Sequence, residues 1–232
     1  MRRFVSAVFN YFTGLRSGQR STRAAAPKGV AVPGNFQEYK ASAEQGDAEA
    51  QFDLGWCYDD GRGVAKDYSE AVKWYHKAAG QNFAPAQFNL GYCYANGQGV
   101  RKDIEEAVEW YRKAAEQNYT PAQSNLGWCY DNGQGVAKDY VEAVKWYRKA
   151  AEQGHPEAQF NLGCCYANGQ AVVKDKVEAY AWFSMAAKAD SDAAGSRALL
   201  RKELTPQQFT DAQKRMKELH WQIVAKSKPS TP

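Results

Sequence analysis

The sequence predicts an all-α solenoid made of four consecutive 36-residue repeats, each containing two helices. Two landmarks recur at this period. The pattern Ala-Gln-x-x-Leu-Gly-x-Cys-Tyr begins at positions 50, 86, 122 and 158. An aromatic pair, Trp-Tyr in three copies and Trp-Phe in the fourth, begins at positions 74, 110, 146 and 182. Repeats of this length bury their apolar faces by stacking on their neighbours, so we expect the repeated residues to be structural.

The first helix of each repeat is expected from about Asp47 to Asp59 and the equivalent later positions. In the first copy, Ala50, Leu54 and Tyr58 recur at helical spacing and form one apolar stripe. The glycines at 61 and 63 then end the helix, because glycine readily adopts the left-handed turn that follows a helix.

The second helix is expected to begin at Asp67, which can act as an N-cap with Glu70 three residues later. The same pair recurs as Asp103/Glu106, Asp139/Glu142 and Asp175/Glu178. Inside this helix, Ala71, Trp74 and Tyr75 share one face, and we expect that face to point inward.

Domain organisation follows from the period. The full repeats cover residues 46–81, 82–117, 118–153 and 154–189, and the solenoid as a whole covers 34–225. Residues 34–45 resemble a lone second helix and predict an N-terminal cap. Residues 190–225 predict a C-terminal cap, whose last helix begins at Thr205-Pro206. We expect residues 226–232 to form a disordered tail.

Residues 1–33 differ in composition from the repeats. They contain six basic residues and no acidic residue, and residues 4–15 would present an apolar face if helical. Three interpretations remain open: a disordered tail, a transit-like targeting sequence, and an amphipathic segment that contacts a membrane surface through residues 1–16.

Charge and cysteine usage narrow the function class. Without the basic N-terminal segment the chain is close to neutral, which argues against a nucleic-acid-binding groove. No run of 18 apolar residues predicts a membrane-spanning helix. Four cysteines recur 36 residues apart, too far from one another in stacked helices for disulfides, so we expect reduced core thiols and a cytoplasmic protein.

The repeat resembles the Sel-one-like repeat family, a relative of the tetratricopeptide repeats. The resemblance rests on the third copy, which reads Ala122-Gln123-x-Asn125-Leu126-Gly127-x-x-Tyr130-x-x-Gly133-x-Gly135-Val136-x-Lys138-Asp139, followed by Glu142-Ala143-x-x-Trp146-Tyr147. It covers about residues 34–225. It implies a right-handed superhelix of antiparallel helix pairs that acts as a protein-binding adaptor, with the first helices lining the concave side.

On that basis we expect a partner segment to bind along the first helices, on the side opposite the Leu54/Tyr58 stripe. Asparagine side chains could hold the backbone of a peptide, and aromatic side chains could anchor it. The candidate partner-binding residues are Phe52, Asp53, Trp56, Asp59, Phe88, Asn89, Tyr92, Asn96, Asn125, Trp128, Asp131, Asn132, Phe160, Asn161 and Asn168. An alternative stays open, in which Phe52 and Trp56 pack between neighbouring repeats.

Nothing in the sequence predicts catalysis. The Gly-x-Gly-Val turns join two helices, whereas phosphate-binding loops join a strand to a helix. The three histidines have no partner at metal-ligand spacing. We therefore expect a monomeric, non-catalytic scaffold that needs no cofactor or metal and binds a protein or peptide. A membrane-proximal assembly factor acting through the N-terminal segment is the alternative, and a hydrolase is a distant third.

Overall fold

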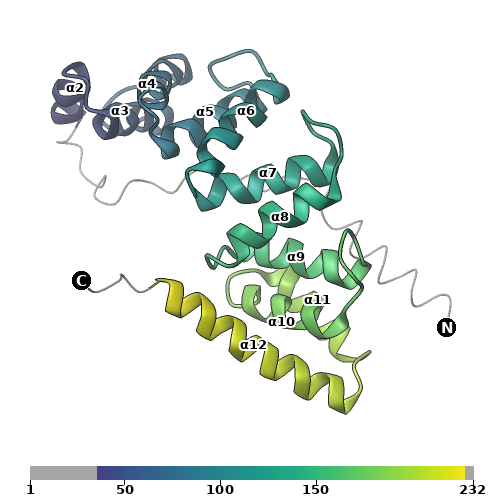
Figure 1. The fold of residues 1–232 in the computed structure, drawn as a ribbon. Helices are drawn as coiled ribbons and strands as arrows, with labels where there is room; N and C mark the ends of the chain where they lie inside the picture. Colours follow the sequence, from purple (N-terminus) through teal and green to yellow (C-terminus); the bar gives the residue numbers. More distant parts are fainter. Residues whose placement is uncertain (1–35, 228–232) are drawn as a thin grey trace. The chain divides into compact units, whose positions relative to one another are not determined.

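The computed structural model describes residues 36–227, and this part of the chain is entirely helical, with eleven α-helices and no strand (Figure 1). The predicted all-α fold is confirmed. The described residues fall into two compact units, an N-terminal unit of residues 36–138 and a C-terminal unit of residues 139–227.

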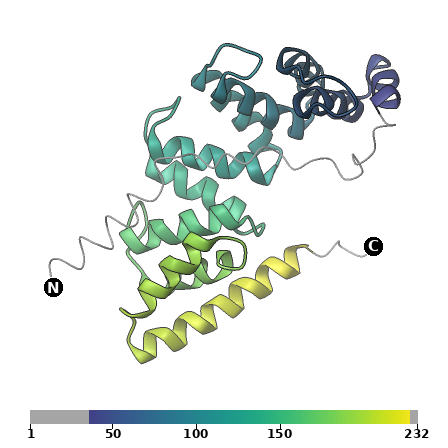
Figure 2. The same ribbon diagram turned by 180° about the vertical axis from the view of Figure 1, so that it is seen from behind.

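The N-terminal unit is a stack of helices in which each packs on the next along the chain (Figures 1 and 2). Its helices are α2 (Phe36–Glu44), α3 (Ala48–Asp60), α4 (Tyr68–Gly80), α5 (Ala84–Asn96), α6 (Ile104–Glu116) and α7 (Thr120–Asn132). Helix α5 therefore has α4 on one flank and α6 on the other.

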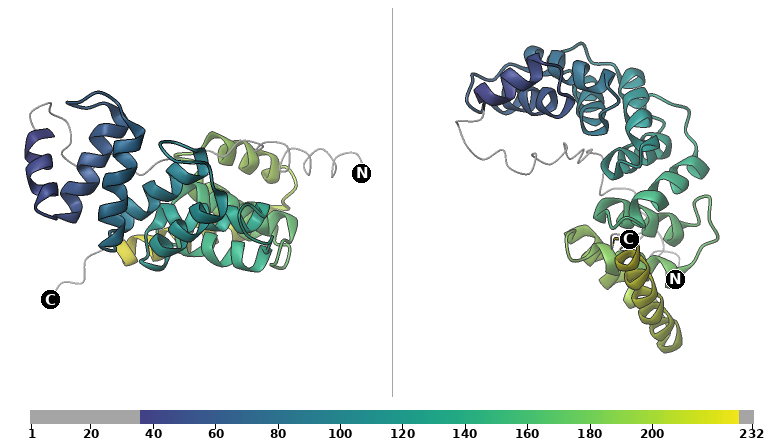
Figure 3. Two further views of the ribbon diagram at one scale, coloured as in Figure 1. Left: turned by 90° about the horizontal axis from the view of Figure 1, so that it is seen from above. Right: turned by 60° about the vertical axis from the view of Figure 1, so that its left-hand side comes forward.

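The C-terminal unit continues the pattern and ends in a long helix (Figure 3). Its helices are α8 (Tyr140–Ala151), α9 (Pro156–Asn168), α10 (Lys176–Ala186), α11 (Ser191–Arg201) and α12 (Pro206–Ser227). Helix α10 is the centre of this unit, because α9, α11 and α12 all pack against it.

The predicted aspartate N-caps are confirmed. Asp67 accepts hydrogen bonds from the backbone N–H groups of Ser69 and Glu70, and the equivalent aspartates of the other three repeats cap α6, α8 and α10. Each bond satisfies a backbone N–H that the first turn of a helix leaves without an intrahelical partner.

The end of each first helix is also as expected. Gly61 has a φ of 75° and donates its backbone N–H to the carbonyl of Cys57, and the equivalent glycines of α5, α7 and α9 repeat this geometry. The left-handed conformation is strained for residues with a Cβ, which explains the recurrent glycine.

A glutamine in the Ala-Gln landmark ties each first helix to the preceding helix. In α5, Gln87 Nε2 donates to the carbonyl of Ala79 at 3.3 Å, and Gln51, Gln123 and Gln159 make the same bond in their repeats. Gln87 Oε1 in turn accepts a bond from Gln117 Nε2 at 2.6 Å. The buried bonds of Gln87, Gln123 and Gln159 to backbone carbonyls link successive repeats, a role that the sequence pattern did not assign to the glutamine.

The two helices of the first, second and fourth repeats pack closely between a helical glycine and an aromatic ring. A Cβ built on Gly91 in α5 would lie 2.8 Å from the ring of Tyr111 in α6, and one on Gly55 would lie equally close to Tyr75. Both tyrosines are fully buried. Glycine is required at this position because any side chain would push the two helices apart.

The two segments predicted as caps contain helices. Helix α2 forms the N-terminal cap and packs on α3, with Ala43 buried. Helix α12 forms the C-terminal cap, with Ala212 and Leu219 buried. Its start is a reciprocal capping box, in which the Gln208 N–H donates to Thr205 Oγ1 and the Thr205 N–H donates to Gln208 Oε1.

The expectations for residues 1–33 and for most of the C-terminal tail lie outside the described residues. Among the residues that the structure describes, no helix is both long enough and apolar enough to cross a membrane.

We predict that Gly91→Ala destabilises the protein by about 2 kcal/mol, because the new methyl group overlaps the Tyr111 ring and lies 3.0 Å from the Ala107 carbonyl. Urea denaturation measures this change. Gly80→Ala is the matched control, since a Cβ at that helical position meets nothing within 4 Å. Equal stability of Gly91→Ala and wild type would show that the close contact is not a constraint.

A second prediction concerns His155, the N-cap of α9, whose Nδ1 accepts the Ala158 N–H at 3.4 Å. Burial lowers the pKa of His155 to about 4. At this residue the unfolded state, with a histidine pKa near 6.5, binds more protons than the folded state between these values, so the contribution of His155 to stability falls as the pH drops from about 6.5 toward 4.

Over this pH range the wild type should lose about 2 kcal/mol of stability relative to His155→Asn, which keeps a side-chain acceptor that does not titrate. Thermal or urea denaturation at pH 7.5 and pH 4.5 measures the difference between the two chains. Identical pH dependence for wild type and variant would contradict this role of His155.

Candidate protein-binding surface

The three phenylalanines among the candidate partner-binding residues, Phe52, Phe88 and Phe160, are part of the core. Phe88 is fully buried, and its ring lies 5.6 Å from the rings of both Tyr111 and Tyr119, centroid to centroid. Phe52 and Phe160 are 4% exposed and pack in the same way. The expectation that these three rings face a partner is wrong, and the alternative of packing within the stack holds for Phe52.

Trp56 is also buried, with 4% of its surface exposed. The guanidinium of Arg62 lies over the indole ring, 4.2 Å from its centroid, and Arg62 Nε donates to Asp60 Oδ2 at 2.6 Å. Trp56 packs with residues of α2, so the N-terminal cap covers the ring. It cannot serve as an exposed anchor in this conformation.

Asp59 has a structural partner within its own repeat. It is 2% exposed, and its Oδ2 accepts a hydrogen bond from the Tyr75 hydroxyl at 3.0 Å. The fourth repeat has Ala167 and Phe183 at these two positions, so the acceptor and the hydroxyl are absent together. Asp59 therefore stabilises the core and does not belong to the surface.

The asparagines at equivalent positions of the last three repeats, Asn89, Asn125 and Asn161, are largely covered by neighbouring helices and form what we call the asparagine row. Asn89 is 1% exposed and Asn125 is 7% exposed, whereas Asn161 in the C-terminal unit is half-buried. The cause is that α5 and α7 pack on the preceding second helix, and α5 also on the following one, which leaves only a narrow strip of each first helix accessible. The expectation that Asn89 and Asn125 grip a peptide backbone is wrong for this conformation.

Asp53 occupies the same row in the first repeat, where the others have asparagine. It is 7% exposed, and its Oδ1 has no hydrogen-bond partner among the described residues. Burial raises the pKa of Asp53 to about 7, with further contributions from the negative charges of Glu49 and Asp47.

Five predicted residues of the N-terminal unit, on the equivalent helices α5 and α7, are not buried. Tyr92 and Trp128 are half-buried and occupy equivalent positions in α5 and α7. Asn96 and Asn132 follow one turn later and are exposed. Asn96 Nδ2 donates to the Tyr92 carbonyl at 2.8 Å, and Asn132 Nδ2 to the Trp128 carbonyl at 3.0 Å.

We call Tyr92, Asn96, Trp128 and Asn132 the Tyr92–Trp128 strip. Asp131, the neighbour of Asn132, is half-buried beside it. In the C-terminal unit, Asn168 occupies the equivalent of Asn96 and Asn132 and is half-buried. The structure thus leaves the predicted residues at the Tyr92 and Asn96 positions of the second and third repeats accessible and places most of the others in the core.

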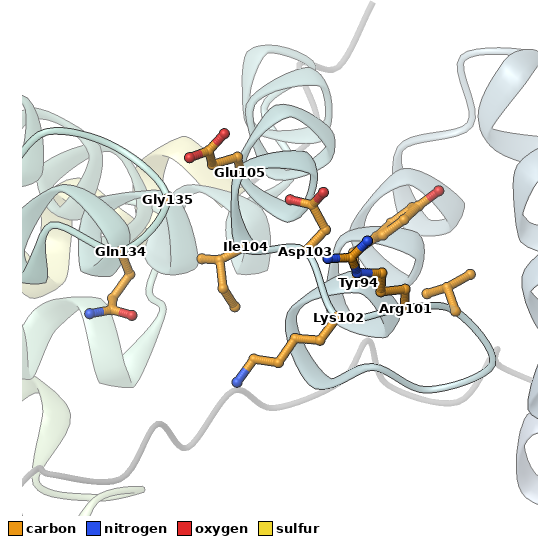
Figure 4. A pocket seen from close by; sticks show the side chains of 9 residues that line it. Tyr94, Arg101, Lys102, Asp103, Ile104, Glu105, Gln134 and Gly135 are labelled. Atoms are coloured by element: carbon orange, nitrogen blue, oxygen red, sulfur yellow. The ribbon is translucent and has the colours of Figure 1, made fainter.

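A hollow between the turns of the second and third repeats was not predicted from the sequence. It has a volume of about 780 Å³ and is lined by Tyr94, Val100, Arg101, Lys102, Asp103, Ile104, Glu105, Gln134 and Gly135 (Figure 4). Figure 4 shows Lys102 extending from one wall toward the side of Gln134. Arg101, Ile104 and Glu105 differ from the residues at the equivalent positions of every other repeat, a signal that the sequence did contain.

The described residues offer no evident catalytic centre. Burial raises the pKa of the Cys57 thiol to about 11 and that of Cys129 to about 12, which disfavours the reactive thiolate at neutral pH. No disulfide forms among the five cysteines. No group of three metal-ligating side chains occurs in residues 36–227.

The fold and the accessible strip define an α-solenoid repeat protein. The Sel1 repeat family model matches residues 48–83, 84–119, 120–155 and 156–191. The chain therefore belongs to the Sel1 repeat family, whose members are typically protein-interaction scaffolds and whose fold is generally non-catalytic.

Solved structures agree with this assignment. The Sel1 repeat protein from Oxalobacter formigenes is 34% identical, with a TM-score of 0.66 over 84% of this chain and 85% of that chain. The protective antigen c5321, present in uropathogenic Escherichia coli strains and displaying an SLR fold, is 29% identical with a TM-score of 0.56. The match covers 98% of this chain but only 56% of c5321.

The immunity protein PA5088 from Pseudomonas aeruginosa is 21% identical with a TM-score of 0.51, over 98% of this chain and 88% of that chain, and shares the fold. A comparison with curated protein sequences found no match.

We predict that Asp59 and Tyr75 are coupled. Tyr75→Phe removes a donor from a buried carboxylate and Asp59→Ala removes the acceptor of a buried hydroxyl, so each single variant should lose about 2 kcal/mol of stability. The double variant Asp59→Ala/Tyr75→Phe copies the residue pair of the fourth repeat and should lose less than the sum of the two. Urea denaturation of the four chains gives the coupling free energy, and strictly additive losses would contradict the assignment.

Proposed function

We propose that this protein is a non-catalytic adaptor that binds a segment of another protein along the Tyr92–Trp128 strip. The observation that carries the proposal is that the strip repeats. The same pair, an accessible aromatic ring with an asparagine one turn later, occurs on two successive first helices of one unit. Most of the other predicted residues are buried in the core.

The chemistry of the strip suits a peptide ligand. Tyr92 and Trp128 each offer a large apolar ring with a polar edge, and such residues dominate the binding energy of many protein interfaces. The asparagine side chains keep hydrogen-bonding capacity beyond the single bond that each donates to its own helix. An apolar anchor with a polar neighbour is the pattern that a short protein segment can complement.

The charge of the N-terminal unit further defines the ligand. Residues 36–138 contain 15 acidic and 10 basic side chains, and Asp131 lies beside the strip. An acidic surface repels nucleic acid and attracts basic segments, so the preferred ligand combines apolar side chains with lysine or arginine. We also propose a cytoplasmic location, which is supported by the five thiols without disulfides.

Affinity capture from the native lysate tests the proposal. The double variant Tyr92→Ala/Trp128→Ala should lose a partner that the wild type retains, because both rings are truncated while the buried rows stay intact. Trp221→Ala is the matched control, since it removes an indole that is 72% exposed on α12 in the other unit.

Circular dichroism first establishes that all three chains are folded. The proposal predicts that the control retains the partner and the double variant does not. Retention by the double variant, or loss in Trp221→Ala alone, would place the binding surface elsewhere on the molecule.

A further inference from the structure

The second repeat lacks an aromatic ring that two other repeats carry beside the hollow of Figure 4. Tyr68 and Tyr140 are the first residues of α4 and α8, whereas Ile104 is the first residue of α6. In the first repeat, Lys66 Nζ lies over the Tyr68 ring, 4.6 Å from its centroid. Lys102 is the equivalent lysine of the second repeat, and it lines the hollow together with Ile104. The second repeat therefore keeps the lysine without the ring on which its equivalent packs.

The turn of the third repeat forms the opposite wall of the hollow and lies directly on α6. A Cβ built on Gly135 would lie 2.5 Å from the carbonyl oxygen of Ile104 and 2.9 Å from its Cγ2. Ile104 is half-buried by this contact, while Lys102 and Gln134 stay exposed on either side of it. The volume of about 780 Å³ lies within the roughly 300–1,000 Å³ typical of ligand clefts and admits a large side chain with its flanking residues.

Two adjacent cations at the hollow have no counter-ion in the fold. Arg101 and Lys102 are exposed, and neither side chain forms an ion pair or hydrogen bond with another of the described residues. Alanine occupies the position of Arg101 in the first and third repeats, so the turn does not require arginine. Of the two carboxylates nearby, Asp103 accepts a backbone N–H as the N-cap of α6, and Figure 4 shows Glu105 pointing away from Lys102. Both cations are therefore available to a ligand.

We propose that this hollow binds a segment of a partner protein in which an aromatic residue lies next to an acidic one. The ring of the segment takes beside Lys102 the place that the Tyr68 ring has beside Lys66, because an ammonium group is attracted to the face of an aromatic ring. The carboxylate pairs with Arg101, whose planar guanidinium can donate two parallel hydrogen bonds to it.

The charge of the surrounding unit limits the occupant to a peptide with few negative charges. Residues 36–138 contain 15 acidic and 10 basic side chains, and this net negative charge repels a polyanion such as a nucleic acid. A single carboxylate that reaches Arg101 gains a local ion pair, which a short segment of protein can supply together with the ring.

The inference does not depend on the proposed function. Tyr94 lines the hollow and Tyr92 belongs to the Tyr92–Trp128 strip, and residues two apart on an α-helix point in directions about 200° apart. The two surfaces therefore use different sides of α5 and can be tested separately.

A nuclear magnetic resonance titration of the isotope-labelled, full-length chain tests the proposal. The probe is an acetylated, amidated peptide with the sequence Glu-Tyr-Glu, added to about 5 mM because one ring contact and one ion pair give weak binding. We expect the backbone amide signals of Lys102 and Gly135 to shift. The peptides Glu-Ala-Glu and Lys-Tyr-Lys, which lack the ring and the carboxylates respectively, should bind at least fivefold more weakly.

Several results of this titration would overturn the proposal. Absence of shifts with Glu-Tyr-Glu would show that the hollow does not take this chemistry. Equal binding of the three peptides would show that the ring and the carboxylates are not recognised. Shifts confined to Tyr92 and Trp128 would place the peptide on the strip and not in the hollow.

The variant Arg101→Ala/Ile104→Tyr closes the site from within. It copies the residues of the first and third repeats, so it is expected to fold, and a thermal melt establishes this. Its own tyrosine supplies the missing ring, and the partner of the carboxylate is removed. Binding of Glu-Tyr-Glu should weaken on the order of tenfold. Unchanged binding would overturn the proposal.

A pair of matched lysine variants separates the hollow from a general effect of charge. Lys102→Ala should weaken binding of Glu-Tyr-Glu, because the ammonium group over the ring is removed. Lys174→Ala is the control, since Lys174 is the equivalent exposed lysine of the fourth repeat, directly before the N-cap aspartate. It should bind like the wild type. Equal losses in the two variants would contradict binding in the hollow.

Discussion

The fold depends on one close contact, between a glycine in the first helix of a repeat and an aromatic ring in the second. Gly55 faces Tyr75, Gly91 faces Tyr111, and Gly163 faces Phe183, each with no room for a Cβ. This contact sets the distance between the paired helices. The other recurrent features, such as the alanines on the inner face of the second helix, are consistent with helices held this close together.

The same close packing limits where the protein can bind anything. A first helix such as α5 has a second helix on each flank, so eight of its 13 residues are buried, including polar ones such as Asn89. What remains is a strip along the helix that carries Tyr92 and Asn96. The repeated residues thus build the solenoid, and we propose that the function resides in residues that stay accessible, such as the Tyr92–Trp128 strip and the turns that line the hollow of Figure 4.

The period, the helix boundaries and the aspartate N-caps could be predicted because they depend on local chemistry that the sequence displays four times. The exposure of Phe88, Asn89 and Trp56 could not. A helical projection shows which residues share a face, but it does not show that neighbours cover two faces of the same helix. The Gln87 bond to Ala79 was likewise invisible, because its acceptor is a backbone carbonyl of another helix. Tyr92 and Trp128 were predicted as anchors. They occupy the positions equivalent to the buried Trp56 and stay accessible.

We propose that the aromatic residues divide into a buried set that holds the repeats together and an accessible set that is available to a partner. Hydroxyl-radical footprinting of the full-length chain tests it with pairs of the same residue type. The account predicts that Tyr92 is oxidised while Tyr75 and Tyr111 are protected, and that Trp128 is oxidised while Trp56 is protected. Oxidation of Trp56 or Tyr111 as fast as that of Trp128 or Tyr92 would contradict the division.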